Sequence, residues 1–292
     1  MSMRLRSPIA WVGGKGLMVG KLLKLMPPHR HYVEVFGGGA SLLFAKKPAG
    51  GIEVYNDLDE GLVHFFRMLR DPKLFWEFYV KAISTPYSRL EYIISRAEWE
   101  GETDPIERAY KWFITARMSF GGIFGASWGY SRSAVSRGMA ADCSKWLSIL
   151  EMLPYLHARF MRVQVECRDW KIVLKAYDAP GTLIYIDPPY LPSTLRDKKT
   201  YKHMLTEEDH VELVEAVLNA PQMILLSGYP HCLYDGLETA GWIKESFQVC
   251  CSSMGHTRFN KILGDGSGRD KQPRTECTWI NYDIKTGKLL SD

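Results

Sequence analysis

Residues 182–190 read Thr-Leu-Ile-Tyr-Ile-Asp-Pro-Pro-Tyr, and this stretch decides the fold that we expect for the chain. The run that ends at Asp187 is apolar nearly throughout, which is typical of a strand buried on both faces of a parallel sheet. Pro188 and Pro189 follow at once, and because proline has a fixed φ and no N–H, they stiffen the turn that leaves the strand. The stretch therefore predicts a buried strand that delivers Asp187 and Tyr190 to the carboxyl edge of a sheet.

Outside this stretch, strand-like and helix-like segments alternate along much of the chain. Glu207–Leu218 has helical periodicity, and Thr206 offers an N-cap. A β-prone run at residues 32–36 ends in Gly37-Gly38-Gly39 and continues into a helix-like stretch, so the pattern is strand, glycine turn, helix. The remaining strand candidates lie at residues 51–55, 162–167, 222–227 and 278–282. Alternation of this kind predicts a parallel α/β sheet.

Residues 61–145 interrupt this alternation. They combine aromatic residues in helix-compatible stretches with a loop region at 119–136 that is rich in glycine, serine and aromatic residues. We therefore predict an inserted second domain at 61–145 and a main domain made of residues 1–60 and 146–292.

Composition and charge place the chain among ordinary globular proteins. Of its 292 residues, 46% are hydrophobic, and Lys+Arg exceed Asp+Glu by 37 to 33, which gives a formal net charge of +4. This mild excess permits a polyanionic partner without requiring one. The six cysteines form no C-x-x-C pair, and no window reaches the ~18 apolar residues that span a bilayer. We expect a reduced, soluble cytoplasmic protein with no signal peptide, no membrane association and no obligate protein partner.

Asp187-Pro188-Pro189-Tyr190 carries the strongest chemical signal in the sequence. The amino group of an aromatic base is a poor nucleophile because its lone pair is delocalised into the ring. Two acceptors for its N–H groups favour a pyramidal, nucleophilic nitrogen, and the carboxylate of Asp187 and the carbonyl of Pro188 can be those acceptors. Tyr190 offers a ring face on which an extruded base can stack. The tetrapeptide therefore predicts a catalytic site made of Asp187, Pro188 and Tyr190.

The glycine turn after residues 32–36 is a second element. Glycines let the backbone approach a nucleotide-like ligand closely, and Asp57, 20 residues after Gly37, lies where an acidic side chain can hold ribose hydroxyls. A dinucleotide fingerprint would need a glycine at 42, where Leu42 stands, so an adenosine-containing ligand other than NAD is favoured. The predicted ligand contacts of this turn are Glu34, Phe36, Gly37 and Gly39.

A third element, Trp11-Val12-Gly13-Gly14-Lys15, lies near the amino terminus. It is not a P-loop, because five residues instead of four separate Gly14 from Gly20-Lys21, and Leu22 replaces the Ser or Thr that binds magnesium. In their order, the three elements and the closing Thr-Glu-Cys-Thr-Trp-Ile-Asn-Tyr at 275–282 resemble the Dam-type, alpha-group adenine-N6 DNA methyltransferases. The resemblance covers most of the chain.

The resemblance implies roles for individual residues. Trp11 and Lys15 match positions that contact the cofactor, S-adenosylmethionine. Asp57 matches the acid that holds the ribose, and Asp187 matches the catalytic acid, which also lies beside the cofactor. Asp169-Trp170 looks like the pair that brackets the cofactor's adenine.

The resemblance also implies a fold and a reaction. The fold would be a Rossmann-like methyltransferase sheet with an inserted, mainly helical target-recognition domain that carries a β-hairpin. The reaction would be site-specific transfer of a methyl group to the N6 amino group of an adenine flipped out of double-stranded DNA. The family includes phage and restriction-modification enzymes, so we expect a protein of a bacterial or phage-infected cell.

Three basic segments are predicted to meet DNA. Cations neutralise phosphates, and aromatic side chains wedge or stack against bases once one is extruded. The insert contributes Arg117, Arg132 and Arg137 beside Phe120, the segment after the catalytic turn contributes Lys198 and Lys199, and the region near the carboxyl end contributes Arg258 and Lys261.

The insert departs from the Dam pattern. Dam-type relatives continue Arg-x-x-Tyr/Phe-Asn-Gly from the position of Arg117, whereas this chain has Gly121 in place of the asparagine and Gly125 where a recognition arginine is expected. Glycine cannot make the bidentate contact with guanine that arginine makes. The resemblance therefore does not extend to recognition of GATC, while adenine stays the expected target.

Two alternatives keep part of this interpretation. The same fold and cofactor would serve methylation of cytosine N4, an RNA base or a glutamine side chain, although such motifs usually begin with Ser or Asn in place of Asp187. The other is a DNA-binding protein with a relic cofactor pocket, against which the intact set of Lys15, Asp57, Asp187 and Tyr190 argues. No cysteine adjoins a proline and no metal-ligand spacing occurs, so we expect direct transfer without a covalent enzyme intermediate and without a metal.

Overall fold

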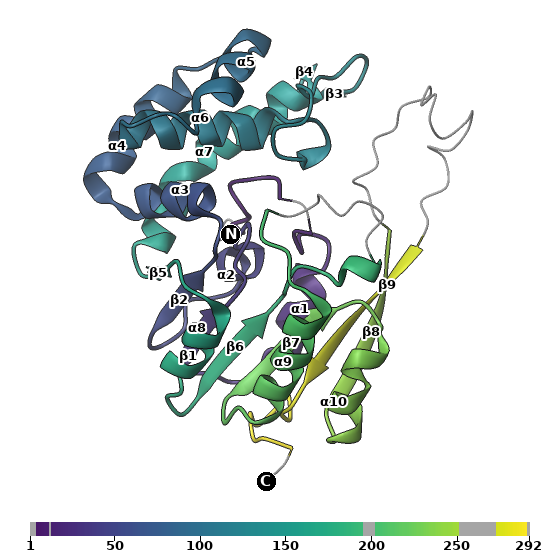
Figure 1. The fold of residues 1–292 in the computed structure, drawn as a ribbon. Coiled ribbons are helices and arrows are strands. Elements are labelled where there is room, and N and C mark those ends of the chain that lie inside the picture. Colours follow the sequence, from purple (N-terminus) through teal and green to yellow (C-terminus); the bar gives the residue numbers. More distant parts are fainter. Residues whose placement is uncertain (1–3, 12, 195–201, 251–272, 291–292) are drawn as a thin grey trace.

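The computed structural model describes residues 4–11, 13–194, 202–250 and 273–290. Within these ranges the chain forms a seven-stranded sheet flanked by helices (Figure 1). In sheet order the strands are β5 (Gln164–Glu166), β2 (Glu53–Asn56), β1 (His31–Glu34), β6 (Thr182–Ile186), β7 (Met223–Gly228), β9 (Pro273–Ile280) and β8 (Ile243–Cys250).

The order of the strands reverses between β1 and β6. β1 pairs in parallel with β2 on one side and with β6 on the other, and the parallel pairing extends from β2 to β5 and from β6 to β7. In doubly wound sheets, ligands bind at the carboxyl ends of the strands where the order reverses. The topology therefore predicts a ligand site at the carboxyl ends of β1 and β6.

The sequence predicts a parallel sheet, but one edge of the described sheet is antiparallel. β9 runs antiparallel to both of its partners, β7 and β8. β8 is absent from the sequence-based prediction. Its residues, Ile-Lys-Glu-Ser-Phe-Gln-Val-Cys, mix polar and apolar side chains, which is typical of an edge strand, and β8 is one of the two edge strands of the described sheet.

Each face of the sheet has its own hydrophobic core, because alternate residues of a strand point to opposite faces. Tyr32, Tyr55 and Tyr185 belong to one core, and their neighbours Val33 and Val54 belong to the other. The first core includes residues of α1 (Val19–Leu25) and α2 (Ser41–Ala45). The second includes residues of α8 (Trp170–Ala176), α9 (Glu207–Leu218) and α10 (Asp235–Thr239). Helices thus cover both faces, as a parallel sheet requires.

The clearest helix prediction is confirmed by α9. It spans Glu207–Leu218, and Thr206 and Asp209 form a capping box in which each side chain accepts from the backbone N–H of the other. The predicted strands before the glycine turn and before Asp187 are also confirmed, although β1 ends at Glu34. Of the helices in the described ranges, none has both the length and the apolar surface that crossing a bilayer needs.

The residues between β2 and β5 form a helical unit, drawn at the top of Figure 1. A short antiparallel hairpin precedes its last helix, with Arg137 and Gly138 at positive φ in the turn. The elements of the helical unit are α3 (Glu60–Arg70), α4 (Pro72–Ile83), α5 (Arg89–Glu98), α6 (Pro105–Met118), β3 (Val135–Ser136), β4 (Met139–Ala140) and α7 (Ala141–Phe160). The described residues also include the short 3-10 turns η1 (Phe120–Gly122), η2 (Pro192–Thr194) and η3 (Cys232–Tyr234).

The helical unit shares its core with one face of the sheet. Phe65 stacks on Phe113 with ring centroids 5.3 Å apart, and the same cluster continues through Phe66 and Phe160 to Tyr55 on β2. The predicted domain boundary at 145 falls inside α7, because this helix is continuous from the hairpin to the sheet. The aromatic residues that indicate an insert thus also pack onto the main sheet.

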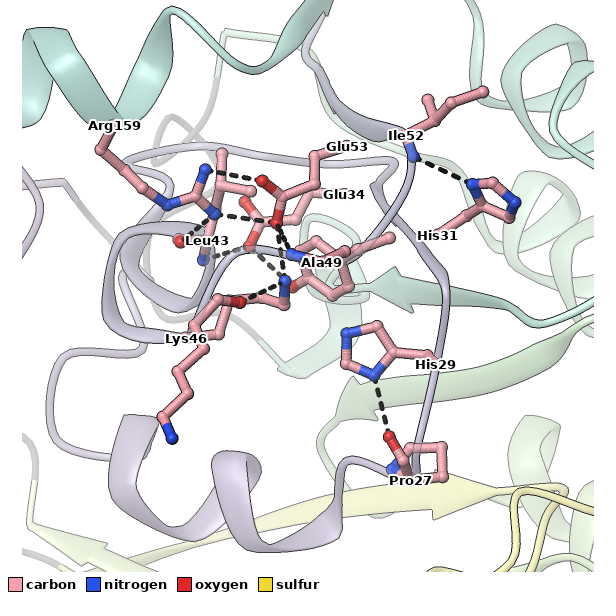
Figure 2. Close-up of polar contacts among 12 residues, drawn as sticks. Pro27, His29, His31, Glu34, Leu43, Lys46, Ala49, Ile52, Glu53 and Arg159 are labelled. Carbon is pink, nitrogen blue, oxygen red and sulfur yellow. Dashed lines mark hydrogen bonds and ion pairs between the residues drawn. The ribbon is translucent and has the colours of Figure 1, made fainter.

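A buried ion cluster ties α7 to the sheet (Figure 2). The guanidinium of Arg159 donates to both oxygens of Glu53 at 2.7 and 2.8 Å, and the ammonium of Lys46 donates to Glu53 at 2.7 Å. Glu53 is 2% exposed and Arg159 is 7% exposed, so these charges are paired away from water. The cluster joins the last helix of the helical unit, the residue after α2, and the first residue of β2.

Candidate active site

The glycine turn and Asp187 leave adjacent strands at the carboxyl edge of the sheet. Glu34 on β1 lies opposite Tyr185 on β6, and the N–H of Val35 donates to the carbonyl of Tyr185 at 3.1 Å. The chain then enters Gly37-Gly38-Gly39 from β1 and Asp187 from β6. Both exits lie where the strand order reverses, which is the place where such sheets bind ligands.

Lys15 connects the amino-terminal segment to the exit of β6. Its ammonium lies 2.9 Å from Oδ1 of Asp187 and 3.1 Å from Oε2 of Glu276 on β9. Lys15 is 5% exposed, and its carbonyl accepts from the N–H groups of Met18 and Val19 at the start of α1. Three segments that are far apart in the sequence therefore meet in one buried group of charges, Lys15, Asp187 and Glu276, which we call the Lys15 cluster.

Tyr190 joins the Lys15 cluster through its hydroxyl. The hydroxyl donates to the two oxygens of Glu276 at 2.8 and 3.0 Å and accepts from the ammonium of Lys15. One face of the ring stacks on Tyr229, with centroids 4.2 Å apart and ring planes inclined by 29°. The hydroxyl of Tyr229 in turn accepts from Nη1 of Arg274 at 3.1 Å. The ring predicted to stack on a base is thus held both at its hydroxyl and on one face.

Burial and neighbouring charges set the ionisation of the Lys15 cluster. Burial raises the pKa of Asp187 to about 6 against the opposing effect of Lys15, and the charge of Glu276 adds to the rise. Burial by itself would lower the pKa of Lys15, but Asp187, Tyr185 and Glu276 together raise it above its ordinary value. At neutral pH the ammonium is therefore charged, and Asp187 is mostly an ionised carboxylate that can accept hydrogen bonds.

Asp57 is held against the glycine turn. One of its oxygens accepts from the N–H of Gly38 at 2.8 Å, and the other accepts from the N–H of Asp59 at 2.9 Å. Burial raises the pKa of this carboxyl. Gly38 has a φ of +47°, which favours glycine, and a Cβ there would lie 3.0 Å from Cδ1 of Trp11. Trp11 and the half-buried carboxylate of Asp57 therefore both lie against Gly38 of the turn.

Trp11 also contacts the helical unit. Its ring centroid lies 6.0 Å from that of Trp112 and 6.5 Å from that of Phe124. The ring of Trp11 is thus packed between the glycine turn and the helical unit.

Glu34, a predicted cofactor contact, is engaged inside the protein. Its carboxylate is 1% exposed and accepts from the hydroxyl of Tyr32 at 2.8 Å and from the N–H of Leu43 at 2.7 Å. Burial raises the pKa of Glu34 to about 7. These contacts fasten α2, which follows the glycine turn, to β1.

The other predicted cofactor contacts occupy two kinds of environment. Asp169 is exposed and caps α8 by accepting from the N–H of Lys171 at 2.8 Å. Trp170 is 3% exposed and belongs to the second core, and Phe36 is half-buried against the same core. The sheet therefore brings all three to its carboxyl side, where β5 and β1 end, but Trp170 is mostly surrounded by protein.

The predicted DNA contacts divide in a similar way. Arg132 is exposed, and Phe120 is 38% exposed. Arg117 at the end of α6 is half-buried, and burial, with a neighbouring arginine, lowers its pKa to about 10. Arg137 donates to the hydroxyl and the carbonyl of Ser144 at 3.0 and 2.8 Å, so it fixes the hairpin to α7. Lys198, Lys199, Arg258 and Lys261 lie outside the described residues.

Sequence reasoning missed Glu276 and Tyr229. The signal for Glu276 is a single carboxylate in the closing run at 275–282, since a charge in a buried strand needs a partner. The signal for Tyr229 is weaker, because its position beside Tyr190 follows from the pairing of β6 with β7 and not from any local pattern.

Comparison with known proteins gives a family and a relative. The model of the D12 class N6 adenine-specific DNA methyltransferase family matches residues 11–227. A DNA N-6-adenine-methyltransferase of Escherichia phage P1 is 24% identical to the chain over 237 residues, which are 77% of this chain and 30% of the phage protein. The chain thus spans less than a third of the length of that relative.

Proposed function

The chain belongs to the D12 class N6 adenine-specific DNA methyltransferase family, and we propose that it methylates the N6 amino group of adenine in double-stranded DNA with S-adenosylmethionine as the methyl donor. One observation carries the proposal: Asp187 and Tyr190, which form the catalytic motif, contact Lys15 at the sheet edge beside the glycine turn. Three sequence elements selected for their chemistry thus contribute to one site.

The donor set at this edge suits S-adenosylmethionine. Asp57 provides a half-buried carboxylate next to the glycine backbone, which fits the hydroxyls of a ribose. The Lys15 cluster holds one ammonium and two carboxylates, so its net charge of −1 favours a positively charged sulfonium nearby. When bound, the donor supplies an electrophilic methyl group. We propose as its contacts Trp11, Lys15, Phe36, Gly37, Gly39, Asp57, Asp169, Trp170 and Asp187, with Glu34 acting through the position of α2.

Asp187 and the carbonyl of Pro188 would hold the adenine amino group. An ionised Asp187 accepts one N–H and the Pro188 carbonyl accepts the other, which favours the pyramidal nitrogen that can attack a methyl carbon. The pKa of about 6 keeps Asp187 mainly ionised at neutral pH. Lys15 fixes the orientation of the carboxylate at 2.9 Å, so much of the rate enhancement would come from positioning.

Tyr190 would receive the extruded base. One ring face is taken by Tyr229, so stacking would use the other face of Tyr190 or displace Tyr229. The hydrogen bonds from the hydroxyl fix the plane of the ring before the base arrives. The helical unit would contact the duplex through Arg117, Phe120 and Arg132, while Arg137 would hold the hairpin in place.

Long-read sequencing that detects modified bases tests this function in cells. DNA from bacteria that express the chain should carry N6-methyladenine at a defined sequence context, and DNA from bacteria that express Asp187→Ala should not. Modified cytosine in place of adenine would redirect the proposal to cytosine N4. Unmodified DNA, combined with methyl transfer to RNA or protein in extracts, would contradict a DNA substrate.

A further inference from the structure

Glu276 contacts Lys15, which is the ion-pair partner of Asp187, and Tyr190. Its Oε2 lies 3.1 Å from the ammonium of Lys15, and both of its oxygens accept from the hydroxyl of Tyr190. Glu276 is 8% exposed. A carboxylate that is this little exposed needs a cation and hydrogen-bond donors to stay charged. Lys15 and the hydroxyl of Tyr190 provide them, so Glu276 is a structural part of the Lys15 cluster.

β9 presents two polar side chains to the stacked tyrosines. Arg274 and Glu276 are alternate residues of the strand, so they project from the same face of the sheet. Arg274 donates to the hydroxyl of Tyr229, and Glu276 accepts from the hydroxyl of Tyr190. The two rings lie 4.2 Å apart between centroids. One strand therefore orients both members of the aromatic pair.

We propose that Glu276 is a positioning residue of this site, which shares the Lys15 ammonium with Asp187 and fixes the hydroxyl of Tyr190. The proposal rests on the function proposed above. It adds a residue of β9 to the site, and it assigns to that residue control over how strongly Asp187 accepts a hydrogen bond. Glu276 itself has no contact with the substrate in this scheme.

The physical reason is the distribution of charge around Lys15. With Glu276 present, the ammonium serves two carboxylates and the cluster carries a charge of −1. Without Glu276, the ammonium would pair with Asp187 alone, and the cluster would be neutral. An Asp187 that is fully occupied by an ammonium is a weaker acceptor for an amine N–H. The charge of Glu276 also raises the pKa of Asp187, so its removal should lower that pKa.

The first test needs neither DNA nor methyl donor. The chain is labelled with ¹³C-aspartate, the Asp187 carboxyl signal is identified by its loss in Asp187→Asn, and its titration is followed by NMR in the parental chain and in Glu276→Gln. The groups that face Asp187 are Lys15, Glu276, and the hydroxyls of Tyr185 and Tyr234. Lys15 and the two tyrosines are unchanged in the variant, so a change in the midpoint reports Glu276.

The expected midpoint is about 6 in the parental chain and lower in Glu276→Gln. Glu238→Gln is the matched control, because Glu238 is exposed and pairs with Lys244 on the outer edge of the sheet; its midpoint should equal the parental one. An unchanged midpoint in folded Glu276→Gln overturns the proposal. If circular dichroism shows that Glu276→Gln is unfolded, Glu276→Asp, which withdraws the carboxylate by one methylene, should give an intermediate midpoint, and a parental midpoint there also overturns it.

The second test is the single-turnover rate of methyl transfer to adenine-containing duplex DNA. We expect Glu276→Gln to slow transfer about 10- to 100-fold at pH 8 and Glu276→Asp to recover part of the rate, as loss of orientation near reacting atoms does. A parental rate in Glu276→Gln overturns the positioning role. A parental chain that methylates no DNA contradicts the proposed function instead, and the NMR titration then still decides the role of Glu276.

Discussion

Lys15 and Asp187 form an ion pair with 2.9 Å between Nζ and Oδ1, in which the Lys15 side chain is 5% exposed and the Asp187 side chain 16%. Lys15 precedes α1 and Asp187 follows β6, so the pair exists only once the amino-terminal segment has docked on the sheet edge. Because the pair is largely shielded from water, the ammonium strongly orients the carboxylate and opposes its protonation. The ion pair thus both requires the docked amino-terminal segment and orients the carboxylate of Asp187.

The rate of methylation should depend on the ionisation of Asp187. The ionised carboxylate is a much stronger acceptor for an amine N–H than the protonated carboxyl group is. Burial raises the pKa of Asp187 to about 6, so kcat/KM should be level above pH 7 and fall about tenfold per pH unit below the midpoint. Lys15→Met removes the ammonium that lowers this pKa, so its midpoint should lie at higher pH. An acidic limb near pH 4, where an exposed aspartate titrates, would refute the assignment.

The ring of Tyr190 should stabilise the extruded base even when its hydroxyl is absent. Stacking of a base on an aromatic ring contributes about 1 to 3 kcal/mol, so Tyr190→Ala should reduce the fluorescence increase of 2-aminopurine placed at the target position. Tyr190→Phe keeps the ring and loses the bonds to Glu276, so it should retain most of the fluorescence increase but show slower methyl transfer. Equal fluorescence responses in all three proteins would show that the base stacks elsewhere.

Arg132 should contribute to DNA affinity through phosphate neutralisation. Its side chain is exposed, whereas Arg137 is bonded to Ser144, so Arg132→Ala should lower the slope of log Kd against log salt by about one unit. Arg132→Lys keeps the charge and is the matched control. If Arg132→Ala leaves the slope unchanged while Arg137→Ala lowers it, the hairpin rotates on DNA and releases Arg137 from α7.

The ion cluster at Glu53 should be a major source of stability. Arg159→Met leaves Glu53 buried with Lys46 as its remaining charged partner, and breaking a buried pair costs about 3 to 5 kcal/mol. Lys145→Met breaks an exposed pair with Asp142 and should cost less than about 1 kcal/mol. Urea denaturation of both variants gives the comparison. Equal losses in the two would mean that the buried cluster contributes no more than a surface pair.

Local patterns predict those parts of the fold that depend on neighbours in the chain. The apolar run before Asp187, the glycines after β1 and the cap at Thr206 each specify their own geometry, and all three lie where they are expected. Parallel pairing then explains why Asp187 and the glycine turn meet at one edge.

Features that depend on distant pairing are harder to predict. The insertion of β9 between β7 and β8 places Glu276 beside Lys15, and no local pattern encodes that order. Composition predicts a domain boundary at 145, but composition does not encode that α7 runs through this position as a single helix that packs on both the helical unit and the sheet. Glu34 shows a related limit, since its place at the end of β1 before the glycine turn predicts a ligand contact, whereas the hydrogen bonds of its carboxylate to Tyr32 and Leu43 follow from the fold. Its contact with the cofactor stays a prediction.

The most direct test of the central claim is the identity of the methylated nucleoside. Duplex DNA is incubated with the purified chain and labelled S-adenosylmethionine, digested to nucleosides and analysed by mass spectrometry, with Asp187→Ala treated in parallel. We predict labelled N6-methyladenine from the parental chain and a loss of at least about 100-fold from Asp187→Ala. Label in another nucleoside, or parental turnover by Asp187→Ala, would contradict the account.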